Sequence, residues 1–508
     1  MALLLVLSLL ATTACSPPPK PAQDTLVIGF GTSLTNTFFD PGLTPGTGIP
    51  LLLQYAQHDA LVRPIRGDPS GPSLAERWTQ SADGLTYDFH LRKGVRFQNG
   101  DPLTADDVKF SFERYQGAGA RLLKQRVARV DIVSPLHVRF QLQQAWPDFM
   151  TFYGTTATGA GWIVPKRYIE QVGDEGFRKQ PIGAGPYRLV SFKPGVEFVF
   201  EASPYYWRRT PNIRRVVIKV IPDAATRLAA VSRGEIDVAY GLSDALAKEA
   251  QRTPGLTLKT ADIPVTNFMI FASLYDASSP WGDPRVREAA NLAIDRRTIN
   301  DALYLGLGRE SSSIIPHAMA YYQAPAPYRY DPVRARALLA QAGYPQGFDG
   351  GELHAENGDF SEMVQSYLAE VGITVKLRLS ERASHLKRLG EKQLGGLAMT
   401  GSGAAGNAAT RLEQFVHSGG ALSYLHDPEL DALIDAQAME TDDAKRTALL
   451  DAAQARLRDG HFFLPVLEYA MVVVVGPRMA FDGVNAIPGS PYTTPYEDLA
   501  FKPASRTQ

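Results

Sequence analysis

The stretch from Leu85 to Val108 constrains the fold more than any other part of this chain. Leu85–Leu91 alternates apolar and polar residues, as a half-buried strand does. Asn99-Gly100-Asp101-Pro102 is a turn sequence, and Thr104–Asp107 is a capping-box pattern that opens a helix ending near Tyr115. The block therefore predicts a strand, a turn and a capped helix, and it offers no catalytic chemistry.

Strands and helices alternate over most of the 508 residues, which predicts an α/β protein with more than one lobe. Residues 127–133 and 137–142 read as a hairpin joined at Ser134-Pro135. Residues 51–61 fit a helix. Further helices begin where an aspartate N-cap precedes a proline, at Asp283-Pro284, Asp331-Pro332 and Asp427-Pro428.

The apolar run Met471–Val475 predicts a strand that is buried on both faces. No helix of its own accompanies it in the sequence. We therefore expect it to return to a sheet that began hundreds of residues earlier.

The first residues resemble an export signal. Ala2–Ala14 is too short to span a bilayer but has the length of a signal-peptide core. Small residues precede Cys15, the only cysteine, as at a bacterial lipoprotein cleavage site. We expect a signal peptide over residues 1–14 and a lipidated Cys15 with a proline-rich tether over residues 15–22. The alternative is a plain secretory peptide.

Composition excludes several classes of protein. A formal net charge of −1 argues against a nucleic-acid partner. One cysteine allows no disulfide framework, and the nine histidines show no metal-ligand spacing. We therefore predict no metal site and no cofactor.

Two short motifs match sequence patterns of nucleotide-binding and penicillin-binding proteins, but neither is accompanied by the other residues that its pattern requires. Gly401–Gly406 matches G-x-G-x-x-G after an expected strand at Gly396–Met399, but no suitable acidic residue follows in a β-α-β unit. Ser384–Lys387 matches S-x-x-K without its companion motifs. Nucleotide binding and a penicillin-binding activity are thus disfavoured.

A series of landmarks accompanies the Leu85–Val108 block. They are Leu74–Trp78, Pro181–Tyr187, Tyr205–Trp207, Gly234–Asp237, Asp283–Arg287, Ala293–Arg296, Ala342–Tyr344, Val371–Ile373 and Asp427–Asp431. In this order they resemble the family 5 solute-binding proteins, extracytoplasmic receptors of ABC importers for peptides, nickel and opines. The resemblance covers nearly the whole mature chain.

The resemblance implies the large periplasmic-binding-protein fold, type II-like, with three domains. Domain I would comprise residues 23–48, 186–263 and 472–508. Domain II would be an insert over residues 49–185, and domain III would span residues 264–471. Two chain crossings, near Ile263–Asn267 and Ala470–Gly476, would form the hinge of a bilobal cleft that closes on a ligand.

Ligand-binding candidates are aromatic or polar residues at loop positions. Packing in a core or between lobes is the alternative for each aromatic. The candidates are Phe38, Phe39, Trp162, Asn267, Trp281, Tyr321, Tyr322, Gly401, Ser402, Asn407 and Arg411.

The loop after the expected strand at Gly396–Met399 departs from the family pattern. In many peptide receptors of the family, an acidic residue here binds the free amine of the ligand. This chain has no carboxylate between Glu391 and Glu413. Because a buried ammonium needs an anionic partner, we expect poor recognition of free-amine peptides unless another lobe supplies the charge.

The sequence therefore predicts a binding protein and not an enzyme. It would be a monomer of the cell envelope, attached to the membrane by its lipid, that captures a peptide-like, sugar-like, opine-like or chelate solute and delivers it to a permease. The alternatives are a receptor or chaperone without transport and, less favoured, a cleft hydrolase, for which no nucleophile–base set is evident.

Overall fold

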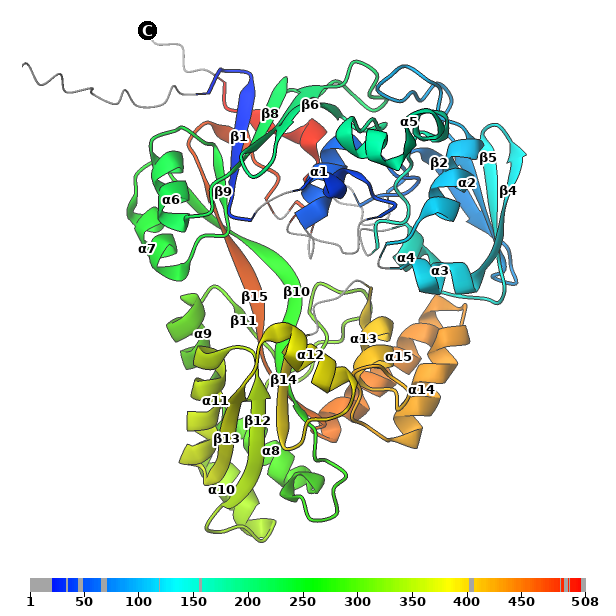
Figure 1. The fold of residues 1–508 in the computed structure, drawn as a ribbon. Coiled ribbons are helices and arrows are strands. Elements are labelled where there is room, and N and C mark those ends of the chain that lie inside the picture. Colours follow the sequence, from blue (N-terminus) through cyan, green and yellow to red (C-terminus); the bar gives the residue numbers. More distant parts are fainter. Residues whose placement is uncertain are drawn as a thin grey trace, which may run out of the picture.

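The computed structural model describes residues 21–503, apart from 33–34, 44–48, 65–70, 118, 155–157, 402–405, 485, 488–491 and 493. The predicted signal peptide and Cys15 lie outside the described residues. Figure 1 shows two bodies, which we call the upper body and the lower body, joined by two long strands. Among the described residues, no helix is both long enough and apolar enough to cross a membrane.

The upper body holds the first half of the chain and its C-terminal end. Its elements are β1 (Thr25–Phe30), η1 (Asn36–Phe39), α1 (Ile49–Gln57), β2 (Ala75–Gln80), β3 (Thr86–Leu91), α2 (Ala105–Arg114), α3 (Ala120–Arg126), β4 (Val127–Ser134), β5 (His137–Leu142), α4 (Phe149–Tyr153), α5 (Lys166–Lys179), β6 (Tyr187–Lys193), β7 (Glu197–Ala202), β8 (Arg215–Val220), α6 (Ala224–Ser232), β9 (Val238–Tyr240), α7 (Asp244–Arg252), β16 (Met479–Phe481), η3 (Tyr496–Asp498) and β17 (Ala500–Phe501). Strands β2, β3, β5 and β4 form a separate antiparallel sheet.

The lower body holds the elements between the two joining strands. They are η2 (Pro280–Gly282), α8 (Pro284–Ala293), α9 (Arg296–Tyr304), β11 (Arg309–Glu310), α10 (Pro332–Gln341), β12 (Phe348–Ala355), α11 (Gly358–Glu370), β13 (Ile373–Leu379), α12 (Arg382–Gly390), β14 (Leu397–Gly401), α13 (Ala408–Phe415), α14 (Pro428–Met439) and α15 (Asp443–Asp459).

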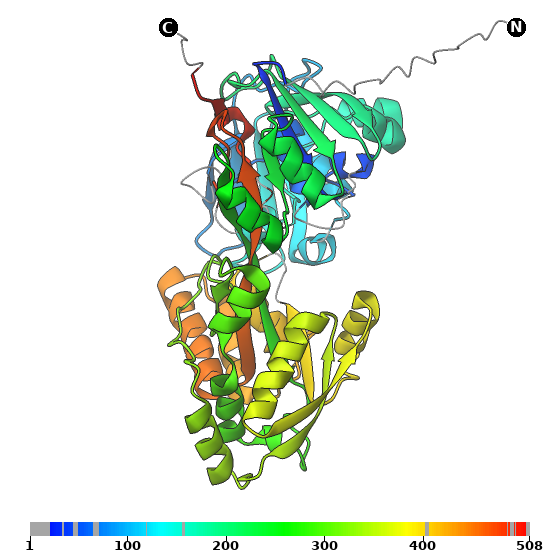
Figure 2. The ribbon, with the colours of Figure 1, turned by 90° about the vertical axis from the view of Figure 1, so that its left-hand side faces the viewer.

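The joining strands are β10 (Thr257–Phe271) and β15 (Phe463–Val475), which run antiparallel to each other from one body to the other (Figures 1 and 2). They belong to one sheet that passes through both bodies in the order β13-β12-β14-β10-β15-β9-β1-β8-β7-β6. Their pairing is interrupted between Asp262 and Thr266, where the sheet passes from the upper to the lower body. A break in the ladder lets paired strands bend at that point.

The strand directions bring the carboxyl ends of parallel strands to the junction from both bodies. β9 is antiparallel to β15, and β1 and β8 run with β9. β14 is antiparallel to β10, and β12 and β13 run with β14. Since β10 descends and β15 ascends, the carboxyl ends of both parallel sets face the opposite body. These ends are where α/β folds bind ligands.

The local predictions from sequence are largely confirmed. The Thr104 amide donates to Asp107 Oδ2 over 2.9 Å at the start of α2, and the aspartates before the three prolines accept backbone N–H groups. The helix expected over residues 51–61 was wrong at its end, because α1 stops at Gln57. Ala60 and Leu61 instead form backbone hydrogen bonds with the chain at Leu74 and Gly161.

Each body has its own hydrophobic core. One core fills the lower body, two cover the two faces of the upper part of the large sheet, and a fourth supports the β2–β5 sheet. A buried ion pair, Arg63 with Glu497 at 2.6 Å, ties the C-terminal end to the chain after α1. With a single cysteine, stability rests on these cores and pairs.

The buried His58 makes the stability of the upper body depend on pH. Burial lowers the pKa of His58 to about 4, although its Nε2 donates to the Phe39 carbonyl over 2.7 Å. The unfolded chain protonates near pH 6.5, so it binds more protons than the folded chain between pH 6.5 and 4, and stability falls as pH falls. We expect His58 to account for about 3 kcal/mol of this loss.

Urea unfolding at pH 7 and pH 4 tests this effect in the wild type and His58→Gln, whose amide can still donate to Phe39. The variant should lose less stability on acidification. An equal loss in both proteins would show that His58 does not titrate as argued.

Candidate functional site

Loops at the carboxyl ends of the lower-body strands form an open pocket of about 540 Å³ at the junction. The chain after β12, the start of α12, β14 and the joining strand β15 each contribute to its wall. Its lining residues are Glu356, Asn357, Gly358, Asp359, Arg382, Met399 and Tyr469.

This pocket carries polar groups suited to a solute with several functional groups. Arg382 Nη1 donates to Glu356 Oε1 over 2.5 Å, while the buried Oε2 of Glu356 has no hydrogen-bond partner among the described residues. The Asn357 side chain accepts from the Phe360 amide and caps α11. The Tyr469 ring packs 5.3 Å from the ring of Tyr304. The pocket thus combines two carboxylates, a guanidinium and an aromatic wall.

A second set of polar side chains lies where the paired strands β10 and β15 pass from one body to the other. His317 Nδ1 and Glu468 Oε2 are 2.5 Å apart, and the His317 amide donates to Glu468 Oε1 over 3.1 Å. Asn267 pairs with Gly401 in the sheet, and its buried Nδ2 has no partner within the described part of the chain. This point of the junction therefore holds an amide donor that the described residues leave unused.

The upper body contributes a carboxylate to the other side of the junction. Asp148, directly before α4, lies within 2.6 Å of Asn407 Nδ2 and also within 2.6 Å of Arg446 Nη2. Both donors belong to the lower body. Asn407 and Arg446 thus contact the opposite body through one acceptor residue.

Three of the predicted aromatics lie in cores. Phe39 has no exposed surface and packs edge-on against Phe198 and Phe200. Trp281 is buried in the lower body, with Nε1 donating to the Gly350 carbonyl over 2.9 Å. Trp162 packs 5.0 Å from Tyr55. Their positions support the core-packing alternative.

The remaining candidates are spread over the junction. Phe38 is half-buried beside the upper core. Tyr321 donates to Asp443 over 2.7 Å, with the Arg446 guanidinium 5.0 Å from its ring centre, and Tyr322 is half-buried.

The candidates after β14 differ among themselves. Asn407 caps α13, and Arg411 is buried on that helix, where burial lowers its pKa to about 10. Gly401 ends β14, and Ser402 lies outside the described residues. Gly401 and Asn407 are thus at the junction, while Arg411 packs inside the lower body.

Sequence reasoning missed Glu356, Arg382, Tyr469, Asp148 and Arg446. The first two lie just after the carboxyl ends of β12 and β13, two strands that were not predicted, and prediction of those strands could have indicated them. Asp148 and Arg446 are 298 residues apart in sequence, and no local pattern links them.

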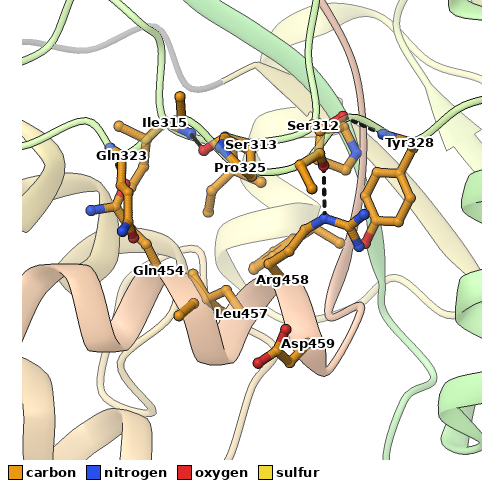
Figure 3. Close-up of a pocket in the computed structure, with 16 residues that line it drawn as sticks. Ser312, Ser313, Ile315, Gln323, Pro325, Tyr328, Gln454, Leu457, Arg458 and Asp459 are labelled. Atoms are coloured by element: carbon orange, nitrogen blue, oxygen red, sulfur yellow. Dashed lines mark hydrogen bonds between the residues drawn. The ribbon is translucent and has the colours of Figure 1, made fainter.

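A separate cavity of about 280 Å³ lies inside the lower body, between residues 312–328 and α15 (Figure 3). Figure 3 shows apolar side chains such as Ile315, Pro325 and Leu457 along it. Arg458 Nε donates to the Ala326 carbonyl, and Ser312 accepts from the Tyr328 amide, so these polar groups already have partners. The cavity belongs to one body, not to the junction.

Comparisons with known proteins agree with this architecture. A model of the bacterial extracellular solute-binding proteins, family 5, matches residues 71–423. The glutathione-binding protein GsiB of Salmonella paratyphi A is 30% identical over 336 residues, which are 63% of this chain and 64% of that protein. The GsiB of Escherichia coli O1:K1 is 29% identical over 75% of this chain and 77% of its own.

Solved structures share the fold. HbpA2 from Haemophilus parasuis has a TM-score of 0.80 and 24% identity, covering 94% of this chain and all of its own. NikA from Brucella suis, in complex with Fe(III)-EDTA, has a TM-score of 0.79, 24% identity and the same coverage.

The position of Trp281 yields a test of its role. Trp281→Ala should lower the free energy of unfolding of the lower body by about 3–5 kcal/mol, because it removes a buried ring. Solute affinity per folded molecule should stay unchanged. Urea unfolding and calorimetric titration measure the two quantities, with the exposed Val333→Ala as a control. A lost affinity with unchanged stability would instead make Trp281 a ligand contact.

Proposed function

Because this chain belongs to the bacterial extracellular solute-binding proteins of family 5, we propose that it captures a solute between its two bodies and delivers it to the permease of an ABC importer. The family consists of solute-binding proteins and not of enzymes. The observation that carries the proposal is the meeting of two sets of strand carboxyl ends across the β10–β15 junction.

The domain division follows the same geometry. We propose domain I as residues 23–48, 186–263 and 472–508, domain II as residues 49–185, and domain III as residues 264–471. The interrupted pairing between Asp262 and Thr266 supports a hinge there, since a broken ladder bends more easily than a continuous one.

We propose a peptide-like solute. GsiB, which shares about 30% of its residues over the aligned part, is named for glutathione, and its alignment spans 64% of its length. Main-chain amides and carbonyls of such a solute match the polar groups of Arg382, Tyr469 and Asn267. A chelate or an opine-like solute remains the second candidate, because a fold relative is described with Fe(III)-EDTA.

The cellular setting is also proposed. Export through the 1–14 signal peptide and anchoring through Cys15 would place the protein, as a monomer, in the periplasm or cell envelope, attached to a membrane by its lipid. The alternative of sensing without transport uses the same binding step and differs only in the partner.

Solute binding is tested by a thermal-shift panel that includes glutathione, di- to pentapeptides, opines and nickel chelates. A solute bound only by the folded protein raises Tm. Arg382→Ala should weaken binding of the best solute by tenfold or more, because it removes a charged donor from the pocket. Arg334→Ala, which breaks the pair between the exposed Arg334 on α10 and Glu288 on α8, is the matched control.

Binding with equal affinity to the wild type and Arg382→Ala would exclude this pocket as the binding site. Turnover of a panel compound would contradict the proposal as a whole.

The charge balance of the junction predicts little preference for free amines. Asp148 is paired with Arg446 and Glu356 with Arg382, so each of these carboxylates already has a cationic partner. The other carboxylate of the pocket wall, Asp359, is exposed to solvent, which screens its charge. Acetylating the amine of a bound peptide should therefore change its Kd by less than about tenfold. Calorimetric titration of matched free and acetylated peptides measures this ratio. A preference of a hundredfold for the free amine would show that a carboxylate is available after all.

A further inference from the structure

Asp148 makes a contact that the solute-binding role does not by itself require. It belongs to the upper body, yet both of its short hydrogen bonds, 2.6 Å each, come from the lower-body residues Asn407 and Arg446. The side chains of Asp148 and Arg446 are 4% and 3% exposed. This is a buried ion pair between the two bodies, and we call Asp148, Asn407 and Arg446 the latch.

The lower body holds its half of the latch in place. The side-chain Oε1 of Gln437 accepts from Arg446 Nε and Nη2 at 3.2 and 3.0 Å, and the Tyr321 ring lies 5.0 Å from the guanidinium. Asn407 caps α13 through Oδ1, which leaves Nδ2 directed to Asp148. The donors are therefore positioned before the bodies meet.

Neighbouring contacts extend the latch into an interface. Gln144 Nε2 lies 4.0 Å from Met439 Sδ, and a Cβ on Gly84 would lie 3.3 Å from the Thr441 methyl. Figure 1 shows α3 and α4 of the upper body facing α13 to α15 of the lower body at this edge. The latch thus closes the side of the junction opposite to the β10–β15 pair.

We infer that the latch holds the two bodies together before a solute arrives and thereby controls how fast a solute enters and leaves. All of its groups belong to the protein, so the closure it gives needs no solute. Removing one partner leaves a charge buried without compensation, which favours separation of the bodies. A solute that enters only the separated form binds in proportion to that form's population.

The direct test is small-angle scattering of the protein without solute. Asp148→Ala and Arg446→Met should each raise the radius of gyration above that of the wild type. The double variant should have no larger a radius of gyration than the single variants, because each single change already removes the same interaction. Arg456→Gln is the matched control, because Arg456 pairs with Asp427 inside the lower body. Its radius of gyration should match the wild type.

A second readout rests on the proposed function. In stopped-flow binding, Asp148→Ala should raise both the association and the dissociation rate constants of the best solute several-fold. If Asp148→Ala does not fold, the same measurement is made on Asp148→Asn, which keeps the shape of the side chain and removes its charge.

A lower Tm with an unchanged radius of gyration would overturn the latch, because Asp148 would then only support folding. Failure to find any solute would count against the proposed function alone, since the scattering comparison needs none.

Discussion

The antiparallel pairing of β10 with β15 is the constraint on which the rest of the molecule depends. The two strands carry one sheet from the upper body into the lower body, and the directions of their neighbours follow from theirs. Because β9 opposes β15 and β14 opposes β10, the parallel strands of both bodies end at the junction. A site assembled from strand-end loops of two bodies is the direct result.

Some of the charged side chains of this molecule are buried in ion pairs. Arg63 and Glu497 join distant parts of the upper body, while Asp148 and Arg446 join the two bodies. Burial of a pair adds little net stability, yet loss of one partner is costly. Separating the two surfaces that such a pair joins is therefore opposed mainly where a charge would stay buried without its partner. In the Asp148 contact, this property would distinguish the closed arrangement from a separated one.

Local chemistry explains what the sequence could predict. The aspartate caps at Asp283, Asp331 and Asp427 and the hairpin over residues 127–142 depend on neighbours within a few residues, and the structure has them. Whether an aromatic side chain faces solvent or a core depends instead on the tertiary fold. In the sequence, Trp281 stands in an irregular stretch before a helix, which made it a candidate for ligand binding. In the structure it is buried against Phe271 and Phe348.

The candidate site was predicted only in outline. Gly401, Asn407 and Asn267 do lie at the junction. The pocket residue Tyr469 and the Asp148 contact depend on which strands pair and on how the bodies meet. The missing carboxylate after β14 is a sequence fact. Only the three-dimensional structure shows that Asp148 of the upper body faces the lower body and pairs there with Arg446.

Hydrogen–deuterium exchange with and without a saturating solute tests the central claim most directly. If the solute lies between the two bodies, exchange should slow at strand ends on both sides of the junction, in the segments that follow β1 and β12. Slowed exchange in one body alone, or only around the lower-body cavity of Figure 3, would contradict the account.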